Sequence, residues 1–293
     1  MDRSHAPIAL RMKFRLRPGL GFWLLPIGFL GLFFFLPLAH IIARSEVFNS
    51  ALSLSPSEWT LIEKPLLFTI YQSSLSTLLT LLIGIPGAYL MAHYQFPGRN
   101  LLRALLIVPF ILPTVVVASS LNALLGPNGL INQSWITIFH LSIPPIRMMN
   151  GFWVIILAHV FYNTSLVIMV VGEAWAKLNP NFELSARTLG AASFSRITRI
   201  TFPLLAPAII SASLLVFLFD FTSFGVILLL GGPSFATLEV EIYIQAIQML
   251  NLRLAAILSA IQIMMTLLLA YLLSRINKGQ SLELTPHFTP GRT

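Results

Sequence analysis

The chain contains six apolar runs that are each roughly 20 residues or longer, enough to cross the hydrocarbon core of a bilayer. They lie near residues 21–43, 66–91, 101–125, 151–172, 204–230 and 254–274. Hydrophobic residues make up 56% of the 293 positions and charged residues only 10%, whereas soluble domains average about 25% charged residues. We therefore expect an all-α membrane protein with about six transmembrane helices.

The distribution of Lys and Arg predicts the orientation of these spans. With the N-terminus in the cytoplasm, fourteen of the 18 cations fall on the cytoplasmic side, as the positive-inside rule requires. Six spans then return the C-terminus to the cytoplasm. The net charge of +8 is explained by this topology, and we expect no nucleic-acid partner.

We divide the chain into three parts. Residues 1–20 form a basic cytoplasmic segment, residues 21–275 form one six-span domain, and residues 276–293 form a polar tail that we expect to be disordered. The apolar stretch that follows "RMKFRLR" is longer than the 7–15 residues of a signal-peptide core, so we interpret it as a retained first span.

The chain lacks the residues that several kinds of chemistry require. The chain has no cysteine and no HExxH pair, so we expect neither a metal site nor a cysteine nucleophile. It has no G-x-x-x-x-G-K-[ST] element and no Gly-Lys dipeptide, so it cannot hold nucleotide phosphates by that route. It also has no GxSxG motif, although serine-based intramembrane catalysis is left open by pattern alone. We predict no catalytic residue and no cofactor.

Residues 173–203, between the fourth and fifth predicted spans, carry too many charges to cross the bilayer. Asn179 is suited to cap a helix that starts at Pro180, and Gly190 is suited to end it in the left-handed conformation. Ser193 is placed to cap a second short helix that reaches about Ile200. We therefore predict two short helices at roughly right angles on the cytoplasmic membrane surface.

The first of these helices has one apolar stripe. Phe182, Ala186 and Leu189 follow at helical spacing, while Glu183 lies early in the helix, where the dipole favours an anion. Such a stripe can rest on lipid or serve as a docking surface for a partner protein, and the physics of the segment leaves both open.

The segment "SARTLGAASFSRITRITFPLL" resembles the cytoplasmic loop of ABC-transporter permeases, which reads EAA, three residues, Gly, nine residues, Ile-x-Leu-Pro. The matching positions are Ala186, Gly190, Ile200 and Pro203. Three positions depart from the motif: Leu184 replaces its glutamate, Ser185 its first alanine and Phe202 its leucine. Glu183 lies one residue before the position of the motif glutamate, so whether it substitutes for that residue stays open.

The resemblance implies a fold and a set of partners. It implies a type I ABC importer fold in which the loop between spans 4 and 5 forms two coupling helices against a cytoplasmic ATPase dimer, which binds the ATP. An extracytoplasmic solute-binding protein and a second permease half are the other implied partners. The chain resembles one half, so it either pairs with an identical or sister permease or is a fragment of a longer product. The implied cellular location is the plasma (inner) membrane of a prokaryote. Glu183, Ala186, Arg187, Gly190, Ile200 and Pro203 are then the expected coupling residues.

Three polar residues inside the spans are candidates for a solute pathway. Asp220 lies deep in an apolar run, and His159 and Asn163 lie four residues apart on one face of the fourth span. Polar groups at membrane depth are costly, so they either face a cavity or form hydrogen bonds between helices. Both interpretations remain open for all three residues.

The solute is less well defined than the family. "VPFILPTVVVASSLNALLGPNGLIN" and "FTSFGVILLLGGPSFATLEVEIYIQA" look like parts of the first half of thiamine and ferric-iron permeases. Molybdate, sulfate or polyamine permeases are the alternatives within the family. An ion-coupled secondary transporter is the alternative outside it, but such proteins usually show more intramembrane charge and inverted repeats.

Overall fold

The computed structural model describes residues 20–37, 39–40, 54–232 and 234–281. These residues are helices joined by turns and loops, with no strand among them, which confirms the predicted all-α class. They fall into two compact units, Met1–Leu52 and Ser53–Thr293, each of which is described by itself. In the first unit, α1 (Leu20–Leu30) continues as the π-helical turn η1 (Gly31–Phe35). Residues 1–19 of the predicted basic segment, and residues 38 and 41–43 of the first predicted span, lie outside the described residues.

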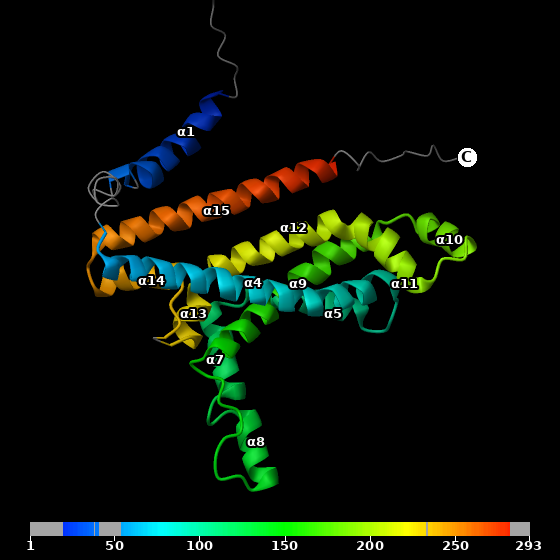
Figure 1. Cartoon of the computed structure of the whole chain (residues 1–293), viewed down its shortest axis with the longest axis horizontal. Coiled ribbons are helices and arrows are strands. Elements are labelled where there is room, and N and C mark those ends of the chain that lie inside the picture. The colour runs from blue at the N-terminus through cyan, green and yellow to red at the C-terminus, as the bar shows by residue number, and fades with distance from the viewer. Residues whose placement is uncertain (1–19, 38, 41–53, 233, 282–293) are drawn as a thin grey trace, which may run out of the picture. The chain divides into compact units, whose positions relative to one another are not determined.

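The second unit is a bundle in which α4, α9, α12 and α15 run side by side, while α7 and α8 extend away from them (Figure 1). Its helices are α4 (Pro56–His93), α5 (Arg99–Leu105), α6 (Val108–Ile111), α7 (Thr114–Leu125), α8 (Leu130–Phe139), α9 (Phe152–Ala176), α10 (Pro180–Thr188), α11 (Ser193–Arg196), α12 (Phe202–Phe221), α13 (Gly225–Leu230), α14 (Leu238–Tyr243) and α15 (Leu252–Ser281), with π-helical turns η3 (Ile197–Thr201) and η4 (Ile244–Gln248). Five helical stretches among the described residues are long and apolar enough to cross a membrane.

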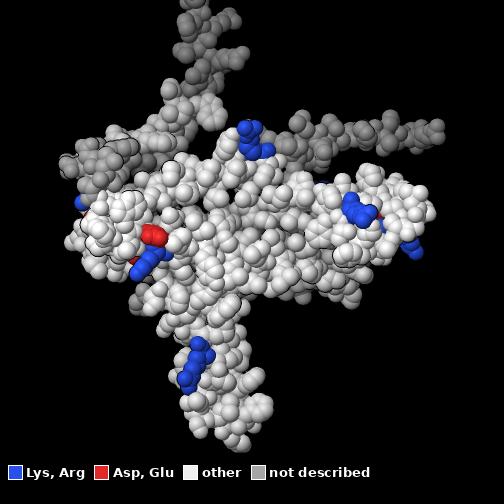
Figure 2. All heavy atoms as spheres, viewed as in Figure 1, with Lys and Arg blue, Asp and Glu red and all other residues white. Residues whose placement is uncertain are grey.

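Charged side chains are few on the visible face of the molecule. Figure 2 shows them in a few separate places with a broad uncharged surface between, as expected of helices that face lipid. The longest of these helices, α4, begins with a capping box in which the Ser55 backbone N–H donates to Glu58 Oε2 (2.8 Å) and the Glu58 N–H donates to Ser55 Oγ (3.3 Å).

Helix α9 is the centre of the second unit. In its most apolar window 61% of the residues are buried inside the protein, against 22–28% for the other four candidate spans. Its first turns, with Val154 and Ile155, pack against α7, α13 and α14 in one apolar core. Its last turns, with Val167 and Val171, pack against α4 and α12 in a second core. The stretch of α9 between the two cores carries His159 and Asn163.

Two predicted spans are interrupted in the structure. The third, 101–125, is divided into α5, α6 and α7. The break between α6 and α7 arises because Pro113 lacks a backbone N–H and holds Leu112 in an extended conformation with ψ 128°. The fifth, 204–230, ends as a helix at Phe221 and resumes as the separate helix α13. The segment between the third and fourth predicted spans, residues 126–150, contains α8, so that Thr114–Phe139 forms one long apolar stretch.

Residues 276–281 of the tail that was predicted to be disordered are helical. Helix α15 continues through Ser281, because no proline removes a backbone donor before Pro286. The rest of the predicted tail, residues 282–293, lies outside the described residues.

Candidate functional site: two helix breaks with a polar cluster, and a capped surface loop

Two breaks in the helices lie against each other in the second unit. One is Leu112–Pro113, between α6 and α7, and the other is the short stretch between α12 and α13. Gly225, at the start of α13, lies so close to α7 that a Cβ on it would be 2.5 Å from Thr114 Oγ1. The hydroxyl of Tyr162 on α9 donates to the Leu112 carbonyl, which the first break leaves without a helical partner (3.4 Å). Broken backbone at membrane depth is found where it is buried in protein or lines a water-filled cavity.

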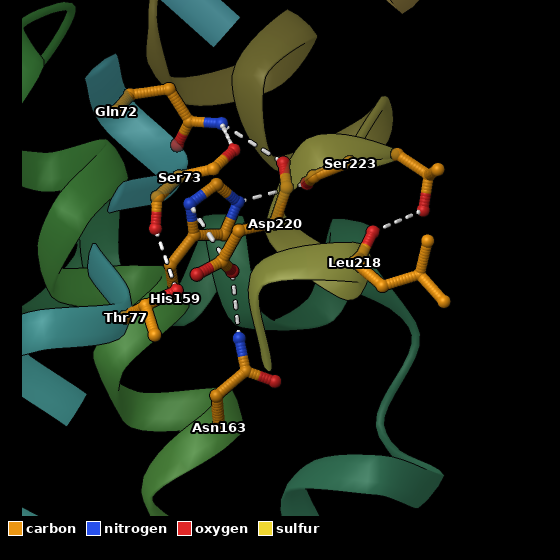
Figure 3. Close-up of polar contacts among 9 residues, drawn as sticks. Gln72, Ser73, Thr77, His159, Asn163, Leu218, Asp220 and Ser223 are labelled. Atoms are coloured by element: carbon orange, nitrogen blue, oxygen red, sulfur yellow. Dashed lines mark hydrogen bonds and ion pairs between the residues drawn. The ribbon is translucent and has the colours of Figure 1, made fainter. Parts of the chain in front are cut away.

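A cluster of buried polar side chains lies behind the second break (Figure 3). Asn163 Nδ2 donates to Asp220 Oδ1 at 2.7 Å, and His159 Nδ1 lies 3.6 Å from the same oxygen. His159 Nε2 also shares a 2.9 Å hydrogen bond with Ser223 Oγ, just beyond the end of α12. Gln72 on α4 donates from Nε2 to the Asp220 carbonyl at 2.9 Å. The cluster thus joins α4, α9 and α12 at the level where α12 ends.

The hydrogen bonds of this cluster are incomplete. Asp220 Oδ2, His159 Nδ1 and Gln72 Oε1 are buried and have no hydrogen-bond partner among the described residues. Ser76 and Thr80, on the same face of α4, are fully buried as well. Buried polar groups are normally paired, and an unpaired one costs stability, so these atoms distinguish the cluster from an ordinary apolar core.

The three predicted pathway residues are therefore brought together, but inside the bundle. Asp220, His159 and Asn163 have exposed fractions of only 1%, 3% and 4% in the single chain. Their contacts fit the interpretation as hydrogen bonds between helices, and a role for them in a pathway stays a prediction. No sequence pattern predicted Ser223 as a member of this group. It lies three residues after Asp220, just beyond the end of α12, which places both residues on the side that faces His159.

The surface loop after α9 begins with the helix that the sequence predicted. Asn179 caps α10 by accepting from the Asn181 backbone N–H at 3.0 Å, and Pro180 occupies its first turn. Gly190 has φ +81°, the Ala191 N–H donates to the Ala186 carbonyl and the Gly190 N–H donates to the Arg187 carbonyl, both at 3.0 Å. This is a Schellman motif, and it defines the angle at which the chain leaves α10.

The second helix of the loop differs from the prediction. It begins at Ser193, but Ala192 occupies the N-cap position and no side chain caps it. It does not end near Ile200: α11 continues through η3 into α12, so that Ser193–Phe221 is one helical stretch. Pro203 stands in the first turn of α12, where its missing N–H is accommodated by the preceding π-helical turn.

The predicted coupling residues take different positions in the loop. Ala186 is buried and Ile200 half-buried, whereas Arg187 is exposed. Glu183 Oε1 lies 4.0 Å from Arg196 Nε, an ion pair that joins α10 to α11. The exposed apolar side chains are Phe182, Leu184, Leu189 and Phe194, with Leu189 87% exposed. The predicted apolar stripe is thus divided, because Ala186 packs inward while Phe182 and Leu189 face outward.

A family model covers both the loop and the helix breaks. Residues 84–279 match the model described as "Binding-protein-dependent transport system inner membrane component". The thiamine transport system permease protein of Brucella abortus (strain 2308) is 33% identical over 227 residues, which cover 77% of this chain and 41% of that protein. A protein of Salmonella choleraesuis (strain SC-B67) proposed as a 2-aminoethylphosphonate transport system permease is 27% identical over 258 residues, covering 86% of this chain and 90% of that protein.

The fold is also that of a chain in a solved ABC transporter. A chain in the crystal structure of a bacterial alginate ABC transporter, in complex with an alginate-bound periplasmic protein, superposes with a TM-score of 0.69. It is 19% identical, and the superposition covers 87% of this chain and 92% of that one. The present chain spans less than half the length of its thiamine permease relative. The chain therefore belongs to the family of binding-protein-dependent transport system inner membrane components, the permeases of ABC transporters.

Proposed function

We propose that this chain is the permease subunit of an ABC importer and forms one half of the solute pathway. The observation that carries the proposal is the loop after α9, whose Schellman turn at Gly190 presents Leu184, Leu189 and Phe194 as an exposed apolar surface. This surface fits a docking site for a cytoplasmic ATPase dimer, which binds the ATP in this proposal. The motif residues Ala186, Gly190, Ile200 and Pro203 shape the loop, and Glu183 with Arg196 holds its two helices together.

The remaining partners follow from the same proposal. An importer of this family takes its solute from an extracytoplasmic binding protein and needs a second permease half. That second half is an identical chain, a sister subunit or the remainder of a longer fused permease. For the solute we propose thiamine or ferric iron, with the thiamine permease relative as support, and another small solute of the family as the alternative.

Affinity co-purification of the full chain from its native membrane tests this proposal. A Walker-motif ATPase should be recovered with the unaltered chain, and Gly190→Val should reduce its recovery several-fold. A left-handed conformation costs an L-residue about 1–2 kcal/mol, more for a β-branched one, so the turn will shift and move the apolar surface.

Gly98 offers a matched control for that substitution. It also has positive φ (+87°) and open space around its Cβ position, but it lies in the loop before α5. Gly98→Val should therefore strain the chain to a similar extent and leave the ATPase bound. Recovery of the chain without an ATPase would contradict the proposal and favour an ion-coupled transporter. Equal loss of ATPase recovery in both variants would assign the effect to misfolding. It would contradict the proposal that the loop is the docking site.

A further inference from the structure

A cavity of about 690 Å³ lies at the end of α9 opposite the capped loop. Its walls come from α7, from the segment before α9 and from the end of α13, and they include Ser119, Asn122, Arg147, Asn150 and Leu229. Its volume falls in the range of about 300–1,000 Å³ that is typical of small-molecule sites, which are mostly apolar with a few polar groups that orient the ligand. The cavity meets that description.

The wall that carries Arg147 is held in place by a buried asparagine. Asn132 on α8 is fully buried, and its Nδ2 donates to the carbonyls of Gly126 (2.8 Å) and Ile146 (2.9 Å). Its Oδ1 accepts from the Ile146 backbone N–H at 2.9 Å. One side chain thus joins the turn after α7 to the residue before Arg147. Rigid support of this kind lowers the entropic cost of placing a charged group at a site.

The cavity has the electrostatic character of an anion site. Arg147 is the single charged residue in its lining, and no acidic side chain lies beside it there. Among the described residues, Arg147 forms no ion pair, and its Nε donates only to the Pro144 carbonyl at 3.4 Å. The terminal nitrogens of the guanidinium group keep the fork geometry that matches sulfate, phosphate and carboxylate oxygens.

We infer that this cavity binds an oxyanion group of a small solute, with Arg147 as the anion-binding residue and Asn132 as the residue that positions it. The inference rests on the proposed function and deepens it, because it assigns a solute chemistry to one end of the pathway. Helix α9 has 25 residues and is therefore about 37 Å long, so the cavity and the capped loop lie about one bilayer thickness apart. The oxyanion is either a free inorganic ion or part of an ester, such as the phosphate of a phosphorylated vitamin.

Equilibrium dialysis of the full chain, extracted into nanodiscs from its native membrane, tests the inference with three probes. Inorganic sulfate represents the free ion, and thiamine monophosphate against thiamine compares the same cation with and without a phosphate. Sulfate or thiamine monophosphate should bind, and thiamine should bind at least tenfold more weakly than its monophosphate. Arg147→Gln should reduce oxyanion affinity about 10–100-fold, since a charge-assisted hydrogen bond is lost, and Arg147→Lys should reduce it less.

Lys64→Gln is the matched control, since Lys64 is an exposed cation that does not line the cavity. It should leave oxyanion binding unchanged. Equal effects of Lys64→Gln and Arg147→Gln would show a general charge effect and overturn the inference, as would the absence of oxyanion binding or equal binding of thiamine and its monophosphate. Recovery of an ATPase from the same nanodiscs without oxyanion binding refutes this inference alone. Binding without an ATPase refutes the proposed function and leaves the site in place.

Discussion

Asp220 shows how one acidic residue can be kept at membrane depth. One carboxylate oxygen accepts from Asn163 and lies near His159, while the Asp220 carbonyl accepts from Gln72. Each of these partners comes from a helix other than α12. A hydrogen bond between membrane helices is usually worth about 0.6 kcal/mol, so the individual bonds are weak. Their combined effect is to define how the end of α12 faces α4 and α9.

At Asp220 we predict that shape and hydrogen bonding matter more for stability than charge. Asp220→Asn keeps an oxygen that can accept from Asn163, so the free energy of unfolding should change by less than about 1 kcal/mol. Asp220→Leu leaves the buried Asn163 amide unpaired and should lower the free energy of unfolding by about 1–3 kcal/mol. Thermal unfolding of the purified full chain in detergent compares the two. A Leu variant as stable as the Asn variant would count against the structural role and favour the pathway role.

At the scale of elements, α4 and α9 pack closely because glycines lie in their interface. A Cβ on Gly84 would lie 2.6 Å from Val167 Cγ1. The two helices are therefore too close at that point for residue 84 to carry a side chain. Farther along the same interface, a Cβ on Gly172 would lie 3.5 Å from the Ala88 carbonyl, which is an ordinary contact. Membrane helices use such small residues because lipid provides no hydrophobic drive for them to associate.

These two glycines give a matched pair of substitutions. Gly84→Ala should destabilise the chain by about 1–3 kcal/mol through overpacking against Val167, whose Cβ also lies too close to move aside. Gly172→Ala should be neutral or slightly stabilising, because alanine favours a helix by up to about 1 kcal/mol over glycine. Unfolding of both variants in the same detergent gives the comparison. Similar unfolding curves would mean that the interface is looser than the structure shows.

The second unit carries the two proposed sites at opposite ends of α9. At one end lie the cavity with Arg147 and the segment that Asn132 holds, and at the other lies the loop capped by Gly190. The helix breaks and the Asp220 cluster lie between these ends, along the same helix. A permease that couples solute passage to a motion of the loop needs this order, because the loop must act on the helix breaks through rigid elements.

The orientation of the unit can be tested with single cysteines, because the natural chain has none. The positive-inside rule predicts that residues 126–150 face outward and residues 173–203 face the cytoplasm. In intact cells, a membrane-impermeant maleimide should therefore label Asn128→Cys. It should label Thr188→Cys only after the membrane is permeabilised, and both positions are exposed. Labelling of Thr188→Cys in intact cells would reverse the predicted topology.

The apolar runs by themselves determined the class of the protein, and Asn179, Pro180 and Gly190 determined where α10 begins and ends. These features depend on bilayer thickness and on backbone hydrogen bonds between residues close in sequence, so the local sequence is sufficient to predict them. Only the tertiary structure decided that Gln72, His159 and Asn163 meet Asp220, and that Asn132 holds the segment before Arg147. The polar cluster joins residues up to 148 positions apart in the chain, and no periodicity of the sequence predicts a contact at such a separation. Which buried polar groups form hydrogen bonds with each other depends on how the helices pack, and that packing is a property of the whole bundle.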